Sequence, residues 1–300
     1  MVKISVFRYP FFVFCFLLFG CQTAVSPSSP TSIQPNPLNT QPTPTLTNPL
    51  TPSPPHPATL SPHPPITPSP PPPDTGWTTL QTGLERRTIR LLDAAGRQTE
   101  QLYLLRIDPA YFDFQIAYSP GRPKSLPAWQ VETGALVVVN GGYFTETYEA
   151  TGVIVVDGAA SGVSYTGFGG MFAVLDAGPE VRRLTERPYS PDEPLRFALQ
   201  SFPVLVRPGG APGFPNEDGI TARRAVVAQD RNGRILFILA PFGSFTLHEM
   251  SVFLVDSDLD IEVALNLDGG TSTGLVLAEP AESVLAFTAV PAVITVYPRE

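Results

Sequence analysis

The stretch Val263-Ala264-Leu265-Asn266-Leu267-Asp268-Gly269-Gly270-Thr271-Ser272 is the most informative in this sequence. Its apolar start predicts a buried strand, which delivers the amide of Asn266 and the carboxylate of Asp268 just before a glycine pair. Gly269 and Gly270 allow positive φ and close backbone approach, so their N–H groups can face a ligand. Because ligands commonly bind beyond the carboxyl ends of strands, we expect a site here. A tight turn, with Asn and Asp bonding their own backbone, is the alternative interpretation.

A second stretch shares this design. The apolar run Leu136-Val137-Val138-Val139 ends in Asn140-Gly141-Gly142-Tyr143-Phe144. It again delivers an amide, Asn140, before two glycines, of which Gly142 is the one expected to face a ligand. If both strands end at the same place, the two amides and Asp268 surround one cavity. Two unrelated tight turns remain the alternative.

Two adjacent arginines, Arg223 and Arg224, open another apolar strand. Neighbours on a strand point to opposite faces, so one guanidinium can reach a site while the other meets solvent. The planar fork of arginine suits a phosphate group. A solvated pair at a strand edge is equally compatible with this pattern.

Thr246-Leu247-His248-Glu249 matches a capping box at the start of a helix. Glu249 is therefore either a helix cap or a second carboxylate for the site. Paired carboxylates are the acid–base groups to expect, because His248 is the only histidine of the three that lies outside the proline-rich segment 26–73. A multi-histidine zinc site is excluded. We predict no cofactor and no metal ligands, and the possibility of a divalent metal stays open.

The folded part is predicted to be α+β, with a β-rich mixed-sheet core, a few covering helices and a single domain. Short apolar runs alternate with Gly, Pro and Asp turns, as is typical of strands. Helices are expected at Ser125–Thr133 and Thr246–Asp256. Strands are expected at Arg86–Leu92, Gln101–Ile107, Phe112–Ser119, Leu136–Asn140, Gly152–Val156, Met171–Leu175, Phe197–Gln200, Val204–Arg207, Arg223–Gln229, Arg234–Leu239, Glu262–Asn266, Gly274–Leu277 and Val293–Val296.

The N-terminal part predicts export and anchoring. Lys3 and Arg8 precede an apolar run that is too short to span a membrane but suits a signal peptide. The run ends in Leu18-Phe19-Gly20-Cys21, which resembles a bacterial lipobox, so Cys21 is the expected lipidation site. An ordinary secretory signal with an incidental cysteine is the alternative. Residues 26–73 hold 19 of the 36 prolines and no charged residue, a composition typical of an extended, disordered tether.

We therefore divide the chain into a signal peptide (1–20), a lipidated cysteine with a proline-rich tether (21–75), an N-terminal β-rich part (76–135) and a core (136–300). The expected location is the cell envelope, periplasmic or at the cell surface, with contact to the membrane through the lipid anchor only. Without Lys3 and Arg8, 17 of the 19 basic residues remain against 27 acidic ones, a net charge of −10. Such a charge disfavours nucleic acid as a partner.

Taken together and in this order, these motifs resemble the phosphodiester glycosidase family. The resemblance covers residues 136–296 and is most specific at Asn266–Ser272. It includes Gln200 in the run Ala198–Val206. The sequence departs from the family pattern at three places: Ser201-Phe202-Pro203 stands where Gly-Pro is frequent, Arg224 where Thr or Ser is usual, and Thr271 where a third glycine is frequent.

The resemblance implies hydrolysis of a sugar-1-phosphodiester, with a sugar phosphate or envelope glycan as the substrate. Asp268 would be nucleophile or general base, and Glu249 its partner. Arg223 and the amides of Gly269 and Gly270 would bind phosphate. Contacts to the sugar would come from Asn140, Gly142, Gln200 and Asn266. Three alternatives remain open: glycan binding without cleavage, cleavage of the P–O bond, and a structural envelope module.

Overall fold

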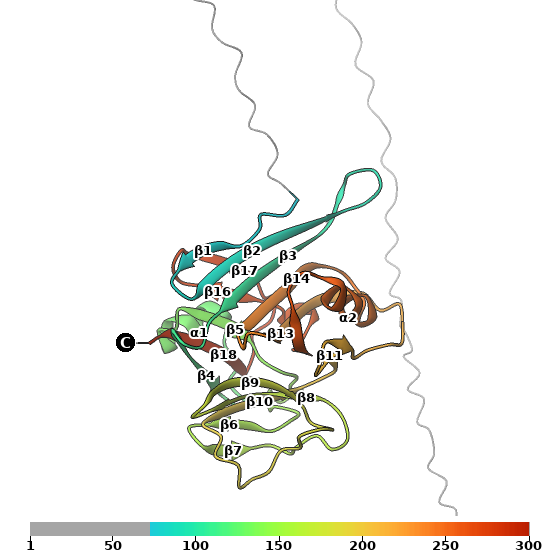
Figure 1. The fold of residues 1–300 in the computed structure, drawn as a ribbon. Helices are drawn as coiled ribbons and strands as arrows, with labels where there is room; N and C mark the ends of the chain where they lie inside the picture. Colours follow the sequence, from blue (N-terminus) through green and yellow to red (C-terminus); the bar gives the residue numbers. More distant parts are fainter. Residues whose placement is uncertain (1–72, 300) are drawn as a thin grey trace, which may run out of the picture. The chain divides into compact units, whose positions relative to one another are not determined.

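Alternating apolar residues build three antiparallel sheets in this protein, which a computed structural model describes over residues 73–299 (Figure 1). The predicted signal peptide, lipidation site and most of the tether lie outside the described residues. Within residues 73–299, neither helix is long and apolar enough to cross a membrane. The predicted α+β class, with much strand and few helices, is confirmed.

The largest sheet has eight strands in the order β1 (Thr78–Gln81), β2 (Leu84–Leu92), β3 (Gln98–Ile107), β14 (Ile235–Phe245), β13 (Ala222–Asp230), β15 (Ile261–Asn266), β11 (Val204–Arg207), β12 (Ala211–Pro212). A five-stranded sheet has the order β7 (Ala159–Ser161), β6 (Ile154–Val156), β10 (Phe197–Ser201), β8 (Gly170–Leu175), β9 (Gly178–Arg183). A second five-stranded sheet has the order β17 (Glu282–Val284), β16 (Leu275–Leu277), β5 (Val137–Asn140), β18 (Ala292–Pro298), β4 (Phe112–Tyr118).

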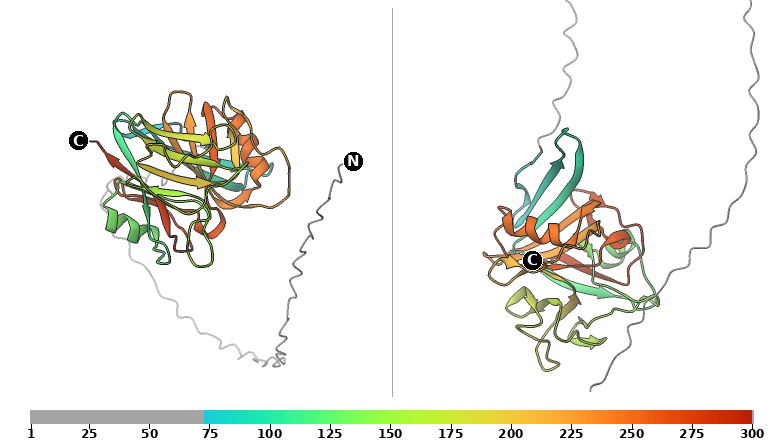
Figure 2. Two further views of the ribbon diagram at one scale, coloured as in Figure 1. Left: turned by 90° about the horizontal axis from the view of Figure 1, so that it is seen from below. Right: turned by 90° about the vertical axis from the view of Figure 1, so that its right-hand side faces the viewer.

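The side-chain period of two distributes the core over both faces of the eight-stranded sheet. On β13, Val227 packs into the central cluster shared by all three sheets, whereas its neighbour Val226 packs under α2 (Leu247–Asp256). The other helix, α1 (Leu126–Thr133), covers the outer face of β5 and β18 through Trp129. The two views of Figure 2 show α1 and α2 on different sides of the sheets.

Both helices begin and end where their sequences predict. Ser125 caps α1 by accepting from Ala128 N at 3.3 Å, and Gly134 ends it with φ of 66°. Thr246 caps α2, and its hydroxyl accepts from Glu249 N at 3.1 Å. A 3-10 turn, η1 (Gly270–Ser272), follows β15.

All the predicted strands are present. The strands that the sequence did not predict are short or polar: β1, β7, β9, β12 and β17. The predicted end of β14 at Leu239 was wrong, because the strand continues to Phe245. The fully buried carboxylate of Glu100 accepts from Phe242 N at 2.9 Å and from Ser244 N at 3.2 Å, which holds this extension against β3.

This arrangement predicts that Glu100→Ala lowers the free energy of unfolding by about 2–3 kcal/mol, since it removes the buried carboxylate that accepts from the backbone N–H groups of Phe242 and Ser244. Urea denaturation of the full chain measures the change. Gln98→Ala, at an exposed position on the same strand, is the control and should change stability by less than about 0.5 kcal/mol. Equal effects of the two substitutions would contradict the role given to Glu100.

Candidate active site

The ends of β5 and β15 meet, although they are far apart in the sequence. Asn140 is fully buried, and its Nδ2 donates to the backbone oxygen of Asp268 at 2.7 Å. Its Oδ1 accepts from Gly274 N at 3.0 Å, and Asp268 N donates to Gly141 O at 3.0 Å. The two glycine-containing stretches singled out in the sequence are therefore joined by hydrogen bonds, and Asn140 holds the backbone on which Asp268 stands.

Asn266 is a second buried amide with a similar position at the end of β15. Its Nδ2 donates to the hydroxyl of Tyr143 at 2.8 Å and to Phe202 O at 3.1 Å. Its backbone N–H donates to Pro203 O at 3.0 Å. Asn266 Oδ1 is buried without a hydrogen-bond partner among the described residues. This side chain thus fixes Tyr143 and Phe202 beside Asp268.

Close backbone contacts explain the glycines around these amides. A Cβ at Gly142 would stand 2.5 Å from Gln200 O, and a Cβ at Gly269 would stand 2.8 Å from Arg223 O. Gly270 has φ of 58°, which favours glycine. These residues let three strands approach each other at the site.

Asp268 is a partly exposed carboxylate whose surroundings disfavour its charge. Burial raises the pKa of Asp268 to about 6, although hydrogen bonds from Ser272 and from the Gly269 backbone act in the opposite direction. Its backbone N–H and C=O groups are both hydrogen-bonded, and the residue as a whole remains partly exposed. A carboxylate that titrates near neutral pH can exchange a proton during a reaction.

Tyr143 lies next to this carboxylate. Burial and the nearby charge of Asp268 raise the pKa of the Tyr143 hydroxyl to about 12, against the opposing effect of Arg224. The ring stacks on Phe202 with 4.4 Å between centroids. Tyr143 belongs to the motif noted in the sequence, but no pattern there distinguished its hydroxyl from that of a core tyrosine.

Of the two arginines, Arg224 shares the face of Asp268. Val226 is opposite Asn266, and Leu267 N donates to Ala225 O at 2.8 Å, so the same register places residue 224 opposite residue 268. Arg224 Nε donates to Phe245 O at 3.0 Å and its Nη2 to Ile220 O at 2.7 Å. Burial lowers the pKa of Arg224.

Arg223, the arginine that the resemblance favoured, extends from the opposite face of β13. Its guanidinium donates to Pro241 O at 2.8 Å and to Leu285 O at 2.6 Å, and lies 4.4 Å from the ring centre of Phe287. Its Nη1 is buried without a hydrogen-bond partner in the described part of the chain. These contacts tie β13 to the loop after β17 and direct Arg223 away from the face that carries Asp268.

Two further predicted site residues are occupied by local structure. Glu249 Oε2 accepts from Thr246 N at 2.8 Å, which completes the capping box of α2, and no hydrogen bond or ion pair joins it to Asp268 in residues 73–299. The fully engaged amide of Gln200 accepts from Val153 N at 3.1 Å and donates to Ser164 Oγ at 2.8 Å. Both residues hold loops and helix ends in place.

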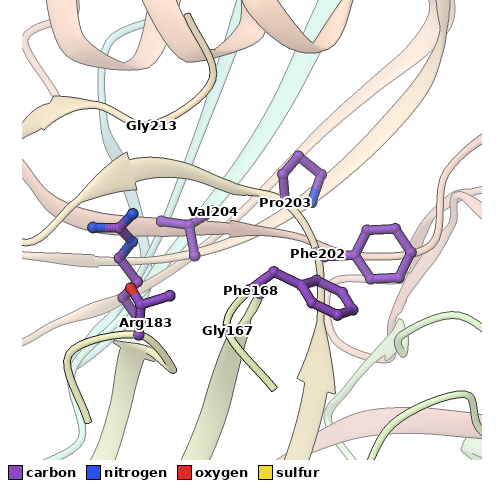
Figure 3. A pocket seen from close by; sticks show the side chains of 9 residues that line it. Gly167, Phe168, Arg183, Phe202, Pro203, Val204 and Gly213 are labelled. Atoms are coloured by element: carbon purple, nitrogen blue, oxygen red, sulfur yellow. The ribbon is translucent and has the colours of Figure 1, made fainter. Parts of the chain in front are cut away.

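Phe202, whose ring stacks on Tyr143, also lines a pocket. This pocket has a volume of about 210 Å³ and is lined by residues that include Phe168, Arg183, Phe202, Pro203 and Val204 (Figure 3). Within residues 73–299, no cluster of three His, Cys, Asp or Glu side chains could hold a metal ion.

Comparison with known proteins supports the sequence resemblance. No curated protein sequence matches the chain. The catalytic domain of zebrafish N-acetylglucosamine-1-phosphodiester alpha-N-acetylglucosaminidase, auto-inhibited by its pro-peptide, is 19% identical with a TM-score of 0.59, covering 72% of this chain and 84% of that one. A hypothetical protein from Synechocystis is 15% identical with a TM-score of 0.53, covering 76% of this chain and 64% of that one.

A putative exported protein from Burkholderia pseudomallei is 14% identical with a TM-score of 0.50, covering 68% of this chain and 76% of that one. At these identities the likeness concerns the fold alone. The phosphodiester glycosidase family itself matches over residues 133–297, which is more than half of the chain and includes both glycine-containing motifs. The chain therefore belongs to the phosphodiester glycosidase family.

Proposed function

We propose that this protein is a hydrolase of sugar-1-phosphodiester linkages, and that Asp268 is its catalytic carboxylate. The observation that carries this proposal is the state of Asp268: a partly exposed carboxylate with a raised pKa, at the centre of the family motif, on a backbone held by Asn140. Membership of the phosphodiester glycosidase family and the likeness in fold both support hydrolysis as the class of reaction.

The chemistry requires little acid assistance. Cleavage of the bond between the anomeric carbon and the phosphate oxygen forms an oxocarbenium-like centre, and the phosphate monoester departs with the bonding electrons. Asp268 either attacks the anomeric carbon, forming a glycosyl ester that water then hydrolyses, or takes a proton from a water that attacks this carbon directly; in both cases the oxygen of the water ends on the sugar. Both roles need the ionised carboxylate.

We assign the phosphate side to Tyr143 and Arg224. The Tyr143 hydroxyl is held by Asn266 at 2.8 Å and remains protonated at neutral pH, so it can donate to a phosphate oxygen. Arg224 lies on the same face of the sheet as Asp268 and adds positive charge to the site. Arg223 takes no part in this scheme, because it extends from the face of β13 opposite to the one that carries Asp268.

The remaining predicted residues position the site. Asn140, Asn266 and Gln200 use their amides on protein atoms, so we assign them to holding the loops rather than to binding sugar hydroxyls. Glu249 is engaged as a helix cap. Gly142, Gly269 and Gly270 permit the close approach of the strands.

We also propose that the hydrolase is anchored in the cell envelope through a lipid on Cys21. The support is the order of the sequence features: a positive start, an apolar run, the lipobox-like Gly20-Cys21 and a long segment rich in proline. In this arrangement the tether lets the domain reach envelope glycans at a distance from the membrane.

The first test is Asp268→Asn, assayed on the methyl phosphodiester of N-acetylglucosamine-1-phosphate. We expect kcat to fall by at least about a thousandfold, because the amide cannot act as nucleophile or base. Asp113→Asn, at an exposed aspartate on β4, is the matched control and should keep full activity. Activity of Asp268→Asn within a few fold of the unmodified protein would remove Asp268 from the mechanism.

The same assay in water labelled with oxygen-18 shows which bond breaks. Label in the released sugar supports attack at carbon, and label in the phosphate would indicate cleavage of the P–O bond. Affinity without turnover would instead identify a glycan-binding module.

The pH dependence of kcat/KM supplies a second test. The raised pKa of Asp268 means that its carboxylate is mostly protonated below about pH 6 and ionised above it. Because the proposed role needs the ionised form, kcat/KM should rise with pH and level off, with a midpoint near pH 6. A fall in kcat/KM through the same range would assign Asp268 the role of general acid.

Lipidation is tested by metabolic labelling in a bacterial host with an alkyne-tagged fatty acid. The full chain should carry the label and appear in the membrane fraction, whereas Cys21→Ser should do neither. Cys15→Ser is the control, since that cysteine lies within the predicted signal peptide and its loss should leave labelling unchanged. Label retained in Cys21→Ser would refute the anchor.

A further inference from the structure

The pocket beside Phe202 combines two kinds of side chain that recognise charged sugars. Figure 3 shows the rings of Phe168 and Phe202 together on one side and the guanidinium of Arg183 on the other. The apolar faces of pyranose rings pack on aromatic rings, and guanidinium groups bind carboxylate and phosphate oxygens. The pocket therefore offers both contacts within one concave surface.

Hydrogen bonds place this pocket next to the candidate active site. Phe202 forms the boundary: one side of its ring stacks on Tyr143 at 4.4 Å, and its edge meets Phe168 at 5.6 Å. Asn266 holds Phe202 in this position, since its Nδ2 donates to Phe202 O and its backbone N–H donates to Pro203 O. A substrate that has its anomeric carbon at Asp268 can extend over Phe202 into the pocket.

The aromatic side chains form a platform rather than a buried core. Phe168 is 48% exposed and stacks on Tyr165 at 4.8 Å between centroids. It follows Gly167 and precedes Gly169, which both have positive φ, so it stands on a loop shaped to present its ring. An exposed ring supported by a second ring is suited to contact a ligand.

Arg183 is available for a ligand as well. Its ion-pair partner is Glu186, at 2.9 Å from Nη1; the Arg183 side chain is 33% exposed and that of Glu186 is 50% exposed. An exposed pair three residues apart contributes little to folding. By contrast, its neighbour Arg182 is buried and forms ion pairs with Glu180 and Glu193. Of the two arginines on β9, Arg182 is therefore the one that stabilises the fold.

The size of the pocket limits what it holds. About 210 Å³ is below the range of roughly 300–1,000 Å³ that is usual for ligand sites, so one sugar-sized group fits and a longer segment does not. The pocket thus corresponds to one unit of a substrate whose other unit occupies the space at Asp268.

We propose that the pocket formed by Phe168, Phe202 and Arg183 binds an anionic sugar unit next to the linkage that is cleaved. The proposal rests on the hydrolase function above and specifies its substrate class: a glycan whose unit adjoining the scissile phosphodiester carries a further negative charge. Phe168 and Phe202 contact the ring of that unit, and Arg183 contacts its charged group.

Binding measured by calorimetry tests this proposal with two synthetic probes. The charged probe contains two N-acetylglucosamine units joined by a phosphodiester. The second unit carries another phosphodiester, whose other ester group is methyl. In the second probe, called neutral because its second phosphate is an uncharged methyl triester, the phosphodiester between the two sugars carries the only charge. Both are titrated into the full chain carrying Asp268→Asn, so that the probes stay intact.

We expect the charged probe to bind about fivefold more tightly than the neutral one, and Arg183→Gln to abolish this preference. Phe168→Ala should weaken both probes alike and keep their ratio. The matched control is Arg97→Gln, an exposed arginine that also pairs with a single carboxylate, and it should change neither affinity.

Equal affinities for the two probes, a preference that persists in Arg183→Gln, or no measurable binding of the charged probe would each overturn the proposal. Failure of the proposed hydrolysis has a different signature. In that case the protein with Asp268 intact leaves both probes uncleaved, while a charge preference that depends on Arg183 still shows in the titrations.

Discussion

The hydrogen bond from Asn140 Nδ2 to the backbone oxygen of Asp268 is the contact on which the rest of this site depends. It joins the end of β5 to the end of β15, which belong to different sheets. The amide is fully buried and also accepts from Gly274 N, so its removal would leave buried backbone groups unpaired. Each such group costs about 1–3 kcal/mol. The backbone of Asp268 is therefore fixed before any substrate arrives.

This rigidity and the raised pKa of Asp268 have a common origin. The strands that converge on Asn140 and Asn266 remove water from around the carboxylate, and desolvation disfavours its ionised form. The same convergence turns the amides inward, toward peptide groups and Tyr143. The amides that the sequence suggested as sugar ligands therefore stabilise the fold around the site. The partly exposed groups that remain able to contact a substrate are Asp268 and Tyr143.

Much of the fold was predictable because it follows local rules. The alternation in Phe112–Tyr118 and the cap at Thr246 specify their elements without reference to the rest of the chain. Strand β1 was missed, since Thr78–Gln81 is polar and depends on pairing with β2. The site was harder to predict from the sequence for a similar reason. Alternation shows that Arg223 and Arg224 face opposite ways, but only the register of β13 on β15 decides which one faces Asp268.

Two departures from the family pattern surround the same residue. Arg224 stands where a small hydroxyl residue is usual, and its charge acts on the Tyr143 hydroxyl. Phe202 belongs to the run Ser201-Phe202-Pro203, which stands where Gly-Pro is frequent, and its ring stacks on Tyr143. Without the Phe202 ring, Tyr143 would lose this stacking partner. Both departures act on Tyr143, whereas the Asn140–Asp268 contact involves neither of them, so the charge and shape around Tyr143 can change while the contact that holds Asp268 stays the same.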